Sequence, residues 1–152
     1  ALWMMPEKSV YGNWPRSGEI DIVETINEKS DELVTTIHYG HDYHRQISKT
    51  TFLNQLTKLS NPIDHNKISL IWEDKYFEWL LNDQLVFKVN FNEIENLEPN
   101  PFLEEFYLLI NVAVGGNWPG TPNSTMYCNS RKSCPDVKKL IVDYIAYYEK
   151  IN

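Results

Sequence analysis

The segment Gly18-Glu19-Ile20-Asp21-Ile22-Val23-Glu24 interleaves three carboxylates with β-branched aliphatic residues. Isoleucine and valine favour a pleated, half-buried strand, whereas aspartate and glutamate are normally depleted from one. Three acids in such a strand therefore indicate either a functional role or partners that stabilise them. On a strict period of two, Glu19 and Asp21 share one face of the strand, and Glu24 points to the other.

A β-bulge between Asp21 and Glu24 would absorb one residue and turn all three carboxylates to the same face. The backbones of Glu19 and Glu24 would then lie about 13 Å apart, and side chains leaning toward each other would close most of that distance. Carboxyl groups about 5–5.5 Å apart serve as nucleophile and acid/base in a retaining glycosidase. The alternative is an edge strand whose acids face water and discourage aggregation.

Three stretches, in the same order, resemble one known family. Residues 12–18 (GNWPRSG) lead into the acids, and together they resemble the active-site strand of glycoside hydrolase family 16, the laminarinase and β-glucanase family. Residues 106–120 (FYLLINVAVGGNWPG) and 142–148 (VDYIAYY) resemble the bacterial laminarinase branch of that family. The resemblance runs from Trp3 to the C-terminus and implies an all-β jelly-roll β-sandwich of the concanavalin A type.

The resemblance covers only the later part of the family's domain. Family members normally have several strands before the stretch that matches residues 2–6, and these strands complete both sheets. We therefore expect residues 1–152 to form a single, partial domain of this kind. Because native proteins avoid long unpaired edges, the chain is a fragment, pairs with a second chain, or swaps strands in a homo-oligomer. The sequence leaves these three alternatives open.

The resemblance also assigns roles to the acids. Glu19 matches the family's nucleophile, Glu24 its acid/base, and Asp21 the carboxylate between them. Glu19 has to be ionised to attack the anomeric carbon, and Glu24 has to be protonated to release the leaving oxygen. Neighbouring negative charge raises the pKa of the better shielded group. Asp21 either orients Glu19 through a hydrogen bond or has a purely structural role.

Four further residues are candidates for substrate binding. Trp14 and Trp118 lie among Gly, Asn and Pro, a loop setting that lets an indole present its flat face to a sugar ring. The alternative is a tryptophan that caps the end of the sandwich. Asn111 interrupts an apolar strand and needs a partner, either a sugar hydroxyl or a backbone group. His38 faces the same cleft or is a hydrogen-bonded structural histidine.

Composition excludes several classes of partner. The formal net charge is −7, which argues against nucleic acid and anionic membranes because both require clustered basic residues. A neutral glucan has no such requirement. No apolar run of 18 residues is present, so we expect no membrane span. The sequence begins at Ala1 with no charged n-region, so we expect no signal peptide, as in a mature secreted protein or an excised fragment.

The two cysteines, Cys128 and Cys134, flank a short polar loop. An extracellular disulfide suits this pair better than a metal site, which needs more ligands, although a reduced pair remains the alternative. Some family members bind a structural calcium through the position that matches Asp143. The other ligands come from the part of the domain that has no match here, so we expect a surface-facing Asp143, no metal site and no cofactor.

The rest of the chain alternates as strands do. Trp72 and Trp79 fall in such strands and are expected in the core, and Asn82-Asp83 is expected to turn a hairpin. Apolar residues at 91, 94 and 97 predict a helix of at most two turns. The strands are predicted at residues 2–5, 18–24, 32–39, 46–53, 67–72, 76–81, 85–89, 105–114 and 138–150.

The function predicted from these observations is an endo-acting, retaining β-glucan hydrolase that is secreted and prefers β-1,3 linkages, with mixed-linkage glucan as the nearest alternative substrate. The linkage preference rests on the family resemblance. The rival functions on the same fold are a β-glucan-binding protein without turnover and an inactive fragment. Binding proteins of this kind typically lack one or both catalytic glutamates, whereas this chain retains Glu19 and Glu24.

Overall fold

The computed structural model describes residues 1–26, 29–53, 65–121 and 140–150. It divides into two compact units, Ala1–Asn111 and Val112–Asn152, and each is described by itself. All the strands in the described part of the chain lie in the first unit. They are β1 (Leu2–Pro6), β2 (Glu19–Ile26), β3 (Lys29–Tyr39), β4 (Arg45–Phe52), β5 (Ile68–Glu73), β6 (Tyr76–Leu81), β7 (Gln84–Asn90) and β8 (Phe106–Ile110).

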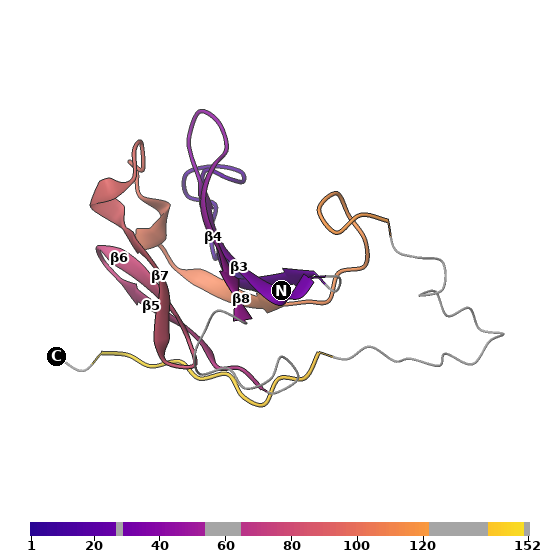
Figure 1. The fold of residues 1–152 in the computed structure, drawn as a ribbon. Coiled ribbons are helices and arrows are strands. Elements are labelled where there is room, and N and C mark those ends of the chain that lie inside the picture. Colours follow the sequence, from indigo (N-terminus) through magenta and orange to yellow (C-terminus); the bar gives the residue numbers. More distant parts are fainter. Residues whose placement is uncertain (27–28, 54–64, 122–139, 151–152) are drawn as a thin grey trace. The chain divides into compact units, whose positions relative to one another are not determined.

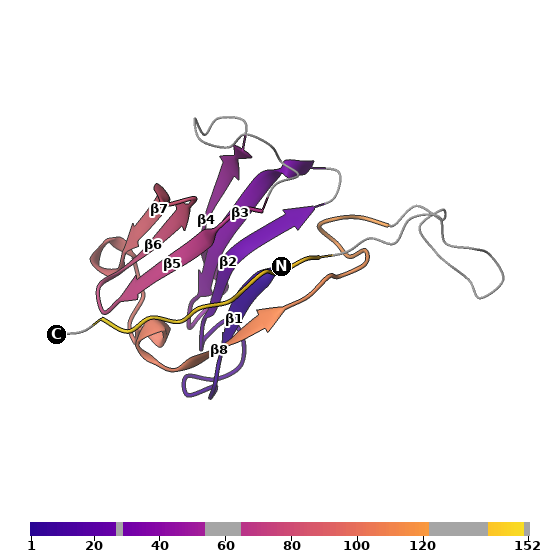
Figure 2. The same ribbon diagram turned by 90° about the horizontal axis from the view of Figure 1, so that it is seen from below.

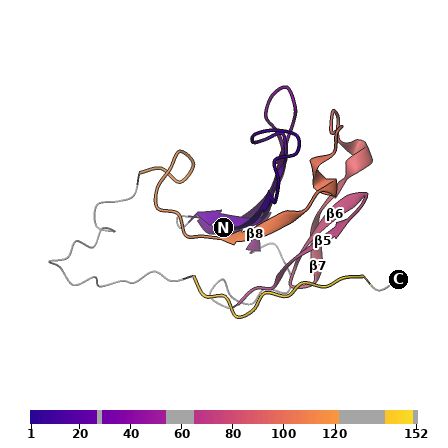
Figure 3. The same cartoon turned by 180° about the vertical axis from the view of Figure 1, so that it is seen from behind.

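The strands of the first unit form two antiparallel sheets. A five-stranded sheet has the order β4-β3-β2-β1-β8, and a three-stranded sheet has the order β5-β6-β7. Figure 2 shows β2 in the middle of the larger sheet, and Figures 1 and 3 show the smaller sheet as a separate layer (Figure 1, Figure 3). The described residues contain two short 3-10 helices, η2 (Phe91–Glu93) and η3 (Pro101–Leu103), and no α-helix. The predicted all-β sandwich is therefore confirmed.

The core lies between the two sheets. Ile20 of β2 and Ile37 of β3 are fully buried from one side, and Phe77 and Trp79 of β6 are fully buried from the other. Trp72 packs against the same cluster and donates its indole N–H to the carbonyl oxygen of Phe102 at 3.0 Å. Both predicted core tryptophans are therefore in the core. The larger sheet buries this face and leaves its other face for the acids.

The β6–β7 hairpin confirms the predicted turn. Asn82 and Asp83 have φ angles of 50° and 65°, and Asx residues tolerate this left-handed region better than most. The predicted helix at residues 91–97 is wrong in type, because only the three-residue η2 forms there. Phe91, Ile94 and Leu97 are nevertheless buried. The apolar spacing therefore predicted which side chains face the core but not the backbone conformation.

Two predicted strands are shorter or absent. β8 was expected to reach residue 114 but ends at Ile110, which pairs with Leu2 at the start of β1. The next amide, that of Asn111, donates to the carbonyl oxygen of Ala1. Residues 140–150 of the second unit are not in a strand. An alternating sequence forms a strand only where a neighbouring strand accepts its hydrogen bonds.

The described residues of the second unit, 112–121 and 140–150, contain one isolated bridge, between Gly116 and Gly120. Its apolar side chains are exposed, among them Ile141, Tyr144 and Tyr147. The prediction of a single domain over residues 1–152 stays a prediction. Among the residues that the structure describes, no helix has the length and apolar character needed to cross a membrane.

Candidate active site

Strand β2 brings the three predicted acids onto one face through a bulge. Asp21 pairs with Thr36 of β3, and Glu24 pairs with Val34, so three steps along β2 face two steps along β3. This register shift is the bulge expected from the sequence. The extra residue returns Glu24 to the face that already holds Glu19 and Asp21.

The opposite face of β2 anchors the strand. Ile20, Ile22 and Val23 are at most 9% exposed and pack into the core. Gly18, just before Glu19, has a φ of +84°, and a Cβ there would lie 3.1 Å from the ring of Phe106 and 3.2 Å from that of Phe102. Glycine is therefore required where β2 begins, both for its backbone conformation and for space.

The loop before β2 places Trp14 beside Glu19. Ser17 is buried, donates its hydroxyl to the carbonyl oxygen of Gly12 at 2.7 Å and accepts the amide of Tyr11 at 3.1 Å. These bonds close the loop on itself, and the indole N–H of Trp14 donates to Oε2 of Glu19. Trp14 is 49% exposed. It is thus a donor to the candidate nucleophile, and part of its ring is open to solvent.

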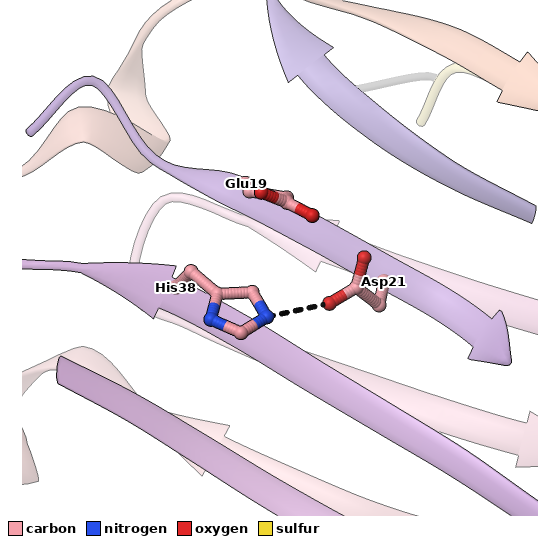
Figure 4. Close-up of side chains that lie close together, drawn as sticks. All are labelled: Glu19, Asp21 and His38. Carbon is pink, nitrogen blue, oxygen red and sulfur yellow. Dashed lines mark ion pairs between the residues drawn. The ribbon is translucent and has the colours of Figure 1, made fainter. Parts of the chain in front are cut away.

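His38 joins the acids from β3. It pairs in register with Glu19, and its Nε2 lies 3.0 Å from Oδ2 of Asp21 (Figure 4). Asp21 is 2% exposed, and an ionised carboxylate only accepts hydrogen bonds, so we assign the proton of this contact to Nε2 of His38. The predicted orienting role of Asp21 is compatible with this geometry, because Asp21 lies between Glu19 and His38.

The surroundings change the pKa values of three of these groups. Burial, the charge of Asp21 and a hydrogen bond with Asp21 raise the pKa of Glu19 from 4.5 to about 7, although the charge of His38 and the Trp14 hydrogen bond oppose this rise. Burial and then the charge of Asp21 raise the pKa of Glu24. Burial lowers the pKa of His38, but its bond to Asp21 and the charges of the carboxylates outweigh burial and raise it.

The sheet face around the acids is polar. Thr36 lies opposite Asp21, and Ser48 of β4 lies opposite Thr36. The two hydroxyl oxygens are 2.9 Å apart. Thr36 is buried, whereas Ser48 is exposed. Hydroxyl groups accept and donate hydrogen bonds, so Ser48 offers a partner suited to a sugar on this face.

On the other side of Asp21, β1 contributes Trp3, which pairs with Asp21 in register. The indole N–H of Trp3 donates to Oδ1 of Asn111 at 2.6 Å. A side chain of the same sheet therefore meets the need of Asn111 for a partner, which was expected from a sugar or the backbone. The sequence left the role of Trp3 open. The register of β1 against β2 is what places it beside the acids.

The structure does not bring all the predicted residues together. Trp118 is 54% exposed in the second unit, and its position relative to the acids is not defined. Cys128 and Cys134 lie outside the described residues. Asp143 is exposed. The predicted catalytic and binding residues that do gather are Glu19, Asp21, Glu24, His38 and Trp14.

One site residue was missed from the sequence. Nε2 of His44, in the loop after β3, lies 2.8 Å from Nδ1 of His38. Its ring also packs on Trp14, with the centroids 4.7 Å apart. The only sequence signal is a further histidine six positions after His38. Its significance depends on the conformation of the loop, which the sequence pattern does not define.

Glu19, Asp21 and His38 each offer one donor atom, and these atoms lie within 4.8 Å of one another. Such spacing suits a metal ion in principle. However, His38 already pairs with Asp21, and Glu19 already accepts a hydrogen bond from Trp14. We therefore describe the three as an acid cluster paired with protein donors and assign no metal ligand to it.

Comparison with known proteins finds glucanases and a glucan-binding protein among the relatives of this chain. No family model matches the chain. It is 34% identical to glucan endo-1,3-beta-glucosidase A1 of Niallia circulans over 99% of this chain and 22% of the relative. It is also 34% identical to the glucan endo-1,3-beta-glucosidase of Cryptopygus antarcticus over 79% of this chain and 46% of the relative. A beta-1,3-glucan-binding protein of Penaeus monodon is 29% identical over 76% of this chain and 38% of that protein.

Solved structures agree with these sequence relatives. The laminarinase catalytic domain of Thermotoga maritima MSB8 matches with a TM-score of 0.71 and 29% identity, over 84% of this chain and 51% of that one. The β-sandwich of this chain is thus similar to that of a laminarinase. A glycoside hydrolase family 16 endo-glucanase of Bacteroides ovatus matches with a TM-score of 0.60 and 25% identity over 79% of this chain. The predicted relationship to glycoside hydrolase family 16 is confirmed, and the chain spans about half the length of these solved domains.

Proposed function

We propose that this chain carries the catalytic face of an endo-acting, retaining β-glucan hydrolase that cleaves β-1,3 linkages. The observation that carries the proposal is the bulge in β2, which presents Glu19, Asp21 and Glu24 on one polar sheet face. An edge strand with solvated acids does not need this arrangement. Asp21 is 2% exposed and paired with His38, whereas acids that only prevent aggregation face water.

In the proposed reaction, the Glu19 carboxylate attacks the anomeric carbon and forms a glycosyl ester while Glu24 donates its proton to the leaving oxygen. Glu24 then takes a proton from water, which attacks the ester and frees Glu19. The raised pKa of Glu24 favours the acid form needed in the first step. The nucleophile becomes available as the pH rises through about 7, the pKa of Glu19.

Two neighbours favour the reactive form of Glu19. The indole N–H of Trp14 donates to its Oε2, and the positive charge of His38 attracts its negative charge. Both effects stabilise the carboxylate over the neutral acid. Trp14 therefore has two proposed roles: its N–H supports the nucleophile, and its exposed ring surface packs against a sugar.

The proposed substrate is a neutral β-glucan. The exposed hydroxyl of Ser48 on the polar sheet face suits sugar hydroxyls, and a chain with a net charge of −7 is poorly suited to polyanions. The preference for β-1,3 linkages is supported by the names of the two glucanase relatives. Since such polymers lie outside cells, we propose that the protein is secreted. We also propose that a further segment, a second chain or a second copy completes the sandwich.

The second candidate function is β-glucan binding without turnover, which the binding protein of Penaeus monodon favours. The experiment that separates the two measures reducing-sugar release from soluble β-1,3-glucan at pH 7.5, alongside glucan binding. Glu19→Gln is the test variant, and Glu105→Gln, which changes an exposed acid, is the matched control. Release that is lost in Glu19→Gln and kept in Glu105→Gln supports hydrolysis. Binding without release in all three proteins supports the binding function.

A further inference from the structure

The loop between β3 and β4 is shaped so that it brings His44 back to His38. Gly40, the first residue after β3, has a φ of +117°, and a Cβ at that position would collide with the carbonyl oxygen of Tyr43. Only glycine adopts this conformation without strain. The tight loop therefore depends on Gly40, and it returns the chain to the catalytic face within four residues.

His44 contacts His38 with both its edge and its face. Its Nε2 lies 2.8 Å from Nδ1 of His38, and the two rings stack with centroids 5.0 Å apart and planes 28° apart. Trp14 packs on His44 from a third element. The ring of His44 is thus located by two aromatic neighbours, although it is exposed to solvent.

The protonation of this pair follows from what each nitrogen faces. Nε2 of His38 faces the Asp21 carboxylate and is a donor. When His38 is a cation, its Nδ1 is also a donor, and His44 accepts through an unprotonated Nε2. The titratable groups that face His38 are the three acids of β2 and His44. Burial and the charge of His38 lower the pKa of His44, which agrees with a neutral acceptor.

We propose that His44 is a positioning residue that accepts a hydrogen bond from Nδ1 of His38 and so holds His38 as a cation against Asp21, beside the nucleophile. This inference deepens the proposed function and rests on it for its catalytic consequence. The cation next to Asp21 favours the ionised form of Glu19. When the pH rises and His38 becomes neutral, its Nδ1 becomes an acceptor, and the His44 proton shifts to Nε2 to keep the bond.

The test uses two substitutions that separate the acceptor from the ring. His44→Phe keeps an aromatic ring against Trp14 and His38 but removes the acceptor. His44→Gln removes the ring but supplies an amide that both accepts and donates. His41→Gln is the control, because His41 lies in the same loop but packs on Tyr11, with its Nε2 3.4 Å from the carbonyl oxygen of Pro99.

The first readout is the titration of His38, followed by ¹⁵N NMR of the imidazole nitrogens in the full chain. His44→Phe should lower the pKa of His38 by about one unit, a tenfold shift in its protonation equilibrium, because the cation loses a charge-assisted hydrogen bond. His44→Gln and His41→Gln should leave it near the wild-type value. An unchanged His38 titration in His44→Phe would overturn the proposal, and so would an equal drop in His44→Gln.

The second readout is the pH profile of kcat/KM on soluble β-1,3-glucan. His44→Phe should move the acid limb to higher pH, whereas His44→Gln should restore it. The two proposals fail in different ways. If the His38 titration shifts as expected but the wild type releases no sugar, the hydrolase function is wrong and the His44 pairing stands. If the wild type hydrolyses glucan but the pKa of His38 is unchanged in His44→Phe, the proposed hydrogen bond between His38 and His44 is wrong.

Discussion

Replacing Glu19 by glutamine should stabilise the folded chain at pH 8 and leave its stability at pH 4.5 nearly unchanged. The fold holds the Glu19 carboxyl beside Asp21, and its pKa rises from 4.5 to about 7. Between these pH values, the folded state binds a proton that the unfolded chain has already lost, so the free energy of unfolding falls as the pH rises. Above pH 7 this loss is complete.

The size of this loss follows from the pKa shift. The pKa of Glu19 differs by about 2.5 between the unfolded and folded states. This difference corresponds to a loss of at most about 3.4 kcal/mol in the free energy of unfolding. The carboxyl of Glu19 is partly exposed, and solvent screening reduces the effect, so we expect about 1–2 kcal/mol. Glutamine has nearly the shape of the protonated acid and donates a hydrogen bond to Asp21 in the same way. It should therefore remove the charge cost while it keeps the contact.

Urea unfolding followed by tryptophan fluorescence at pH 4.5, 6 and 8 measures this difference. The midpoint for Glu19→Gln should exceed that of the wild type at pH 8, and the two should converge at pH 4.5 with similar slopes. Glu105→Gln, an exposed acid, should match the wild type throughout. A Glu19→Gln variant that is less stable at pH 8, or equally shifted at every pH, would refute the electrostatic reasoning.

The remaining predictions concern the catalytic groups and their support. Trp14→Phe removes the indole donor that lowers the pKa of Glu19. The acid limb of the kcat/KM profile should therefore move to higher pH, and an unmoved limb in the pH–rate assay would contradict this. Glu24→Gln should lower kcat on glucan by about 10²–10⁴ but slow an aryl glycoside with a good leaving group far less; equal losses in steady-state kinetics would remove the acid role. Gly18→Ala should destabilise the fold by roughly 2 kcal/mol in urea unfolding, since φ is +84° and the new Cβ meets Phe102 and Phe106; a change near zero would show that β2 can shift.

The bulge could be predicted from the sequence because side-chain alternation restricts strands strongly. Three acids at positions 19, 21 and 24 share a face only if one residue is inserted, and the register of β2 against β3 shows that insertion. The burial of Phe91, Ile94 and Leu97 followed in the same way from apolar spacing. The α-helix expected there did not form, because the spacing of buried residues does not by itself specify backbone hydrogen bonds.

Features that depend on contacts distant in sequence could not be predicted. The extent of β8 depends on its pairing with β1, and the bond between Trp3 and Asn111 joins residues 108 positions apart. His44 reaches His38 only because the loop after Gly40 turns back sharply. Each of these three features depends on tertiary structure. The acid strand, in contrast, could be recognised from its own unusual composition.

In the proposed reaction, Glu19 forms a covalent bond to a glucan during turnover. The most direct test of this step is intact-mass and peptide mass spectrometry of the full chain after incubation with an activated 2-deoxy-2-fluoro β-1,3-glucoside, which slows hydrolysis of the glycosyl ester. We expect one added glycosyl group, located on Glu19 and absent from Glu19→Gln. A wild-type protein that releases reducing sugar yet carries the label on another residue, or no label at all, would contradict it.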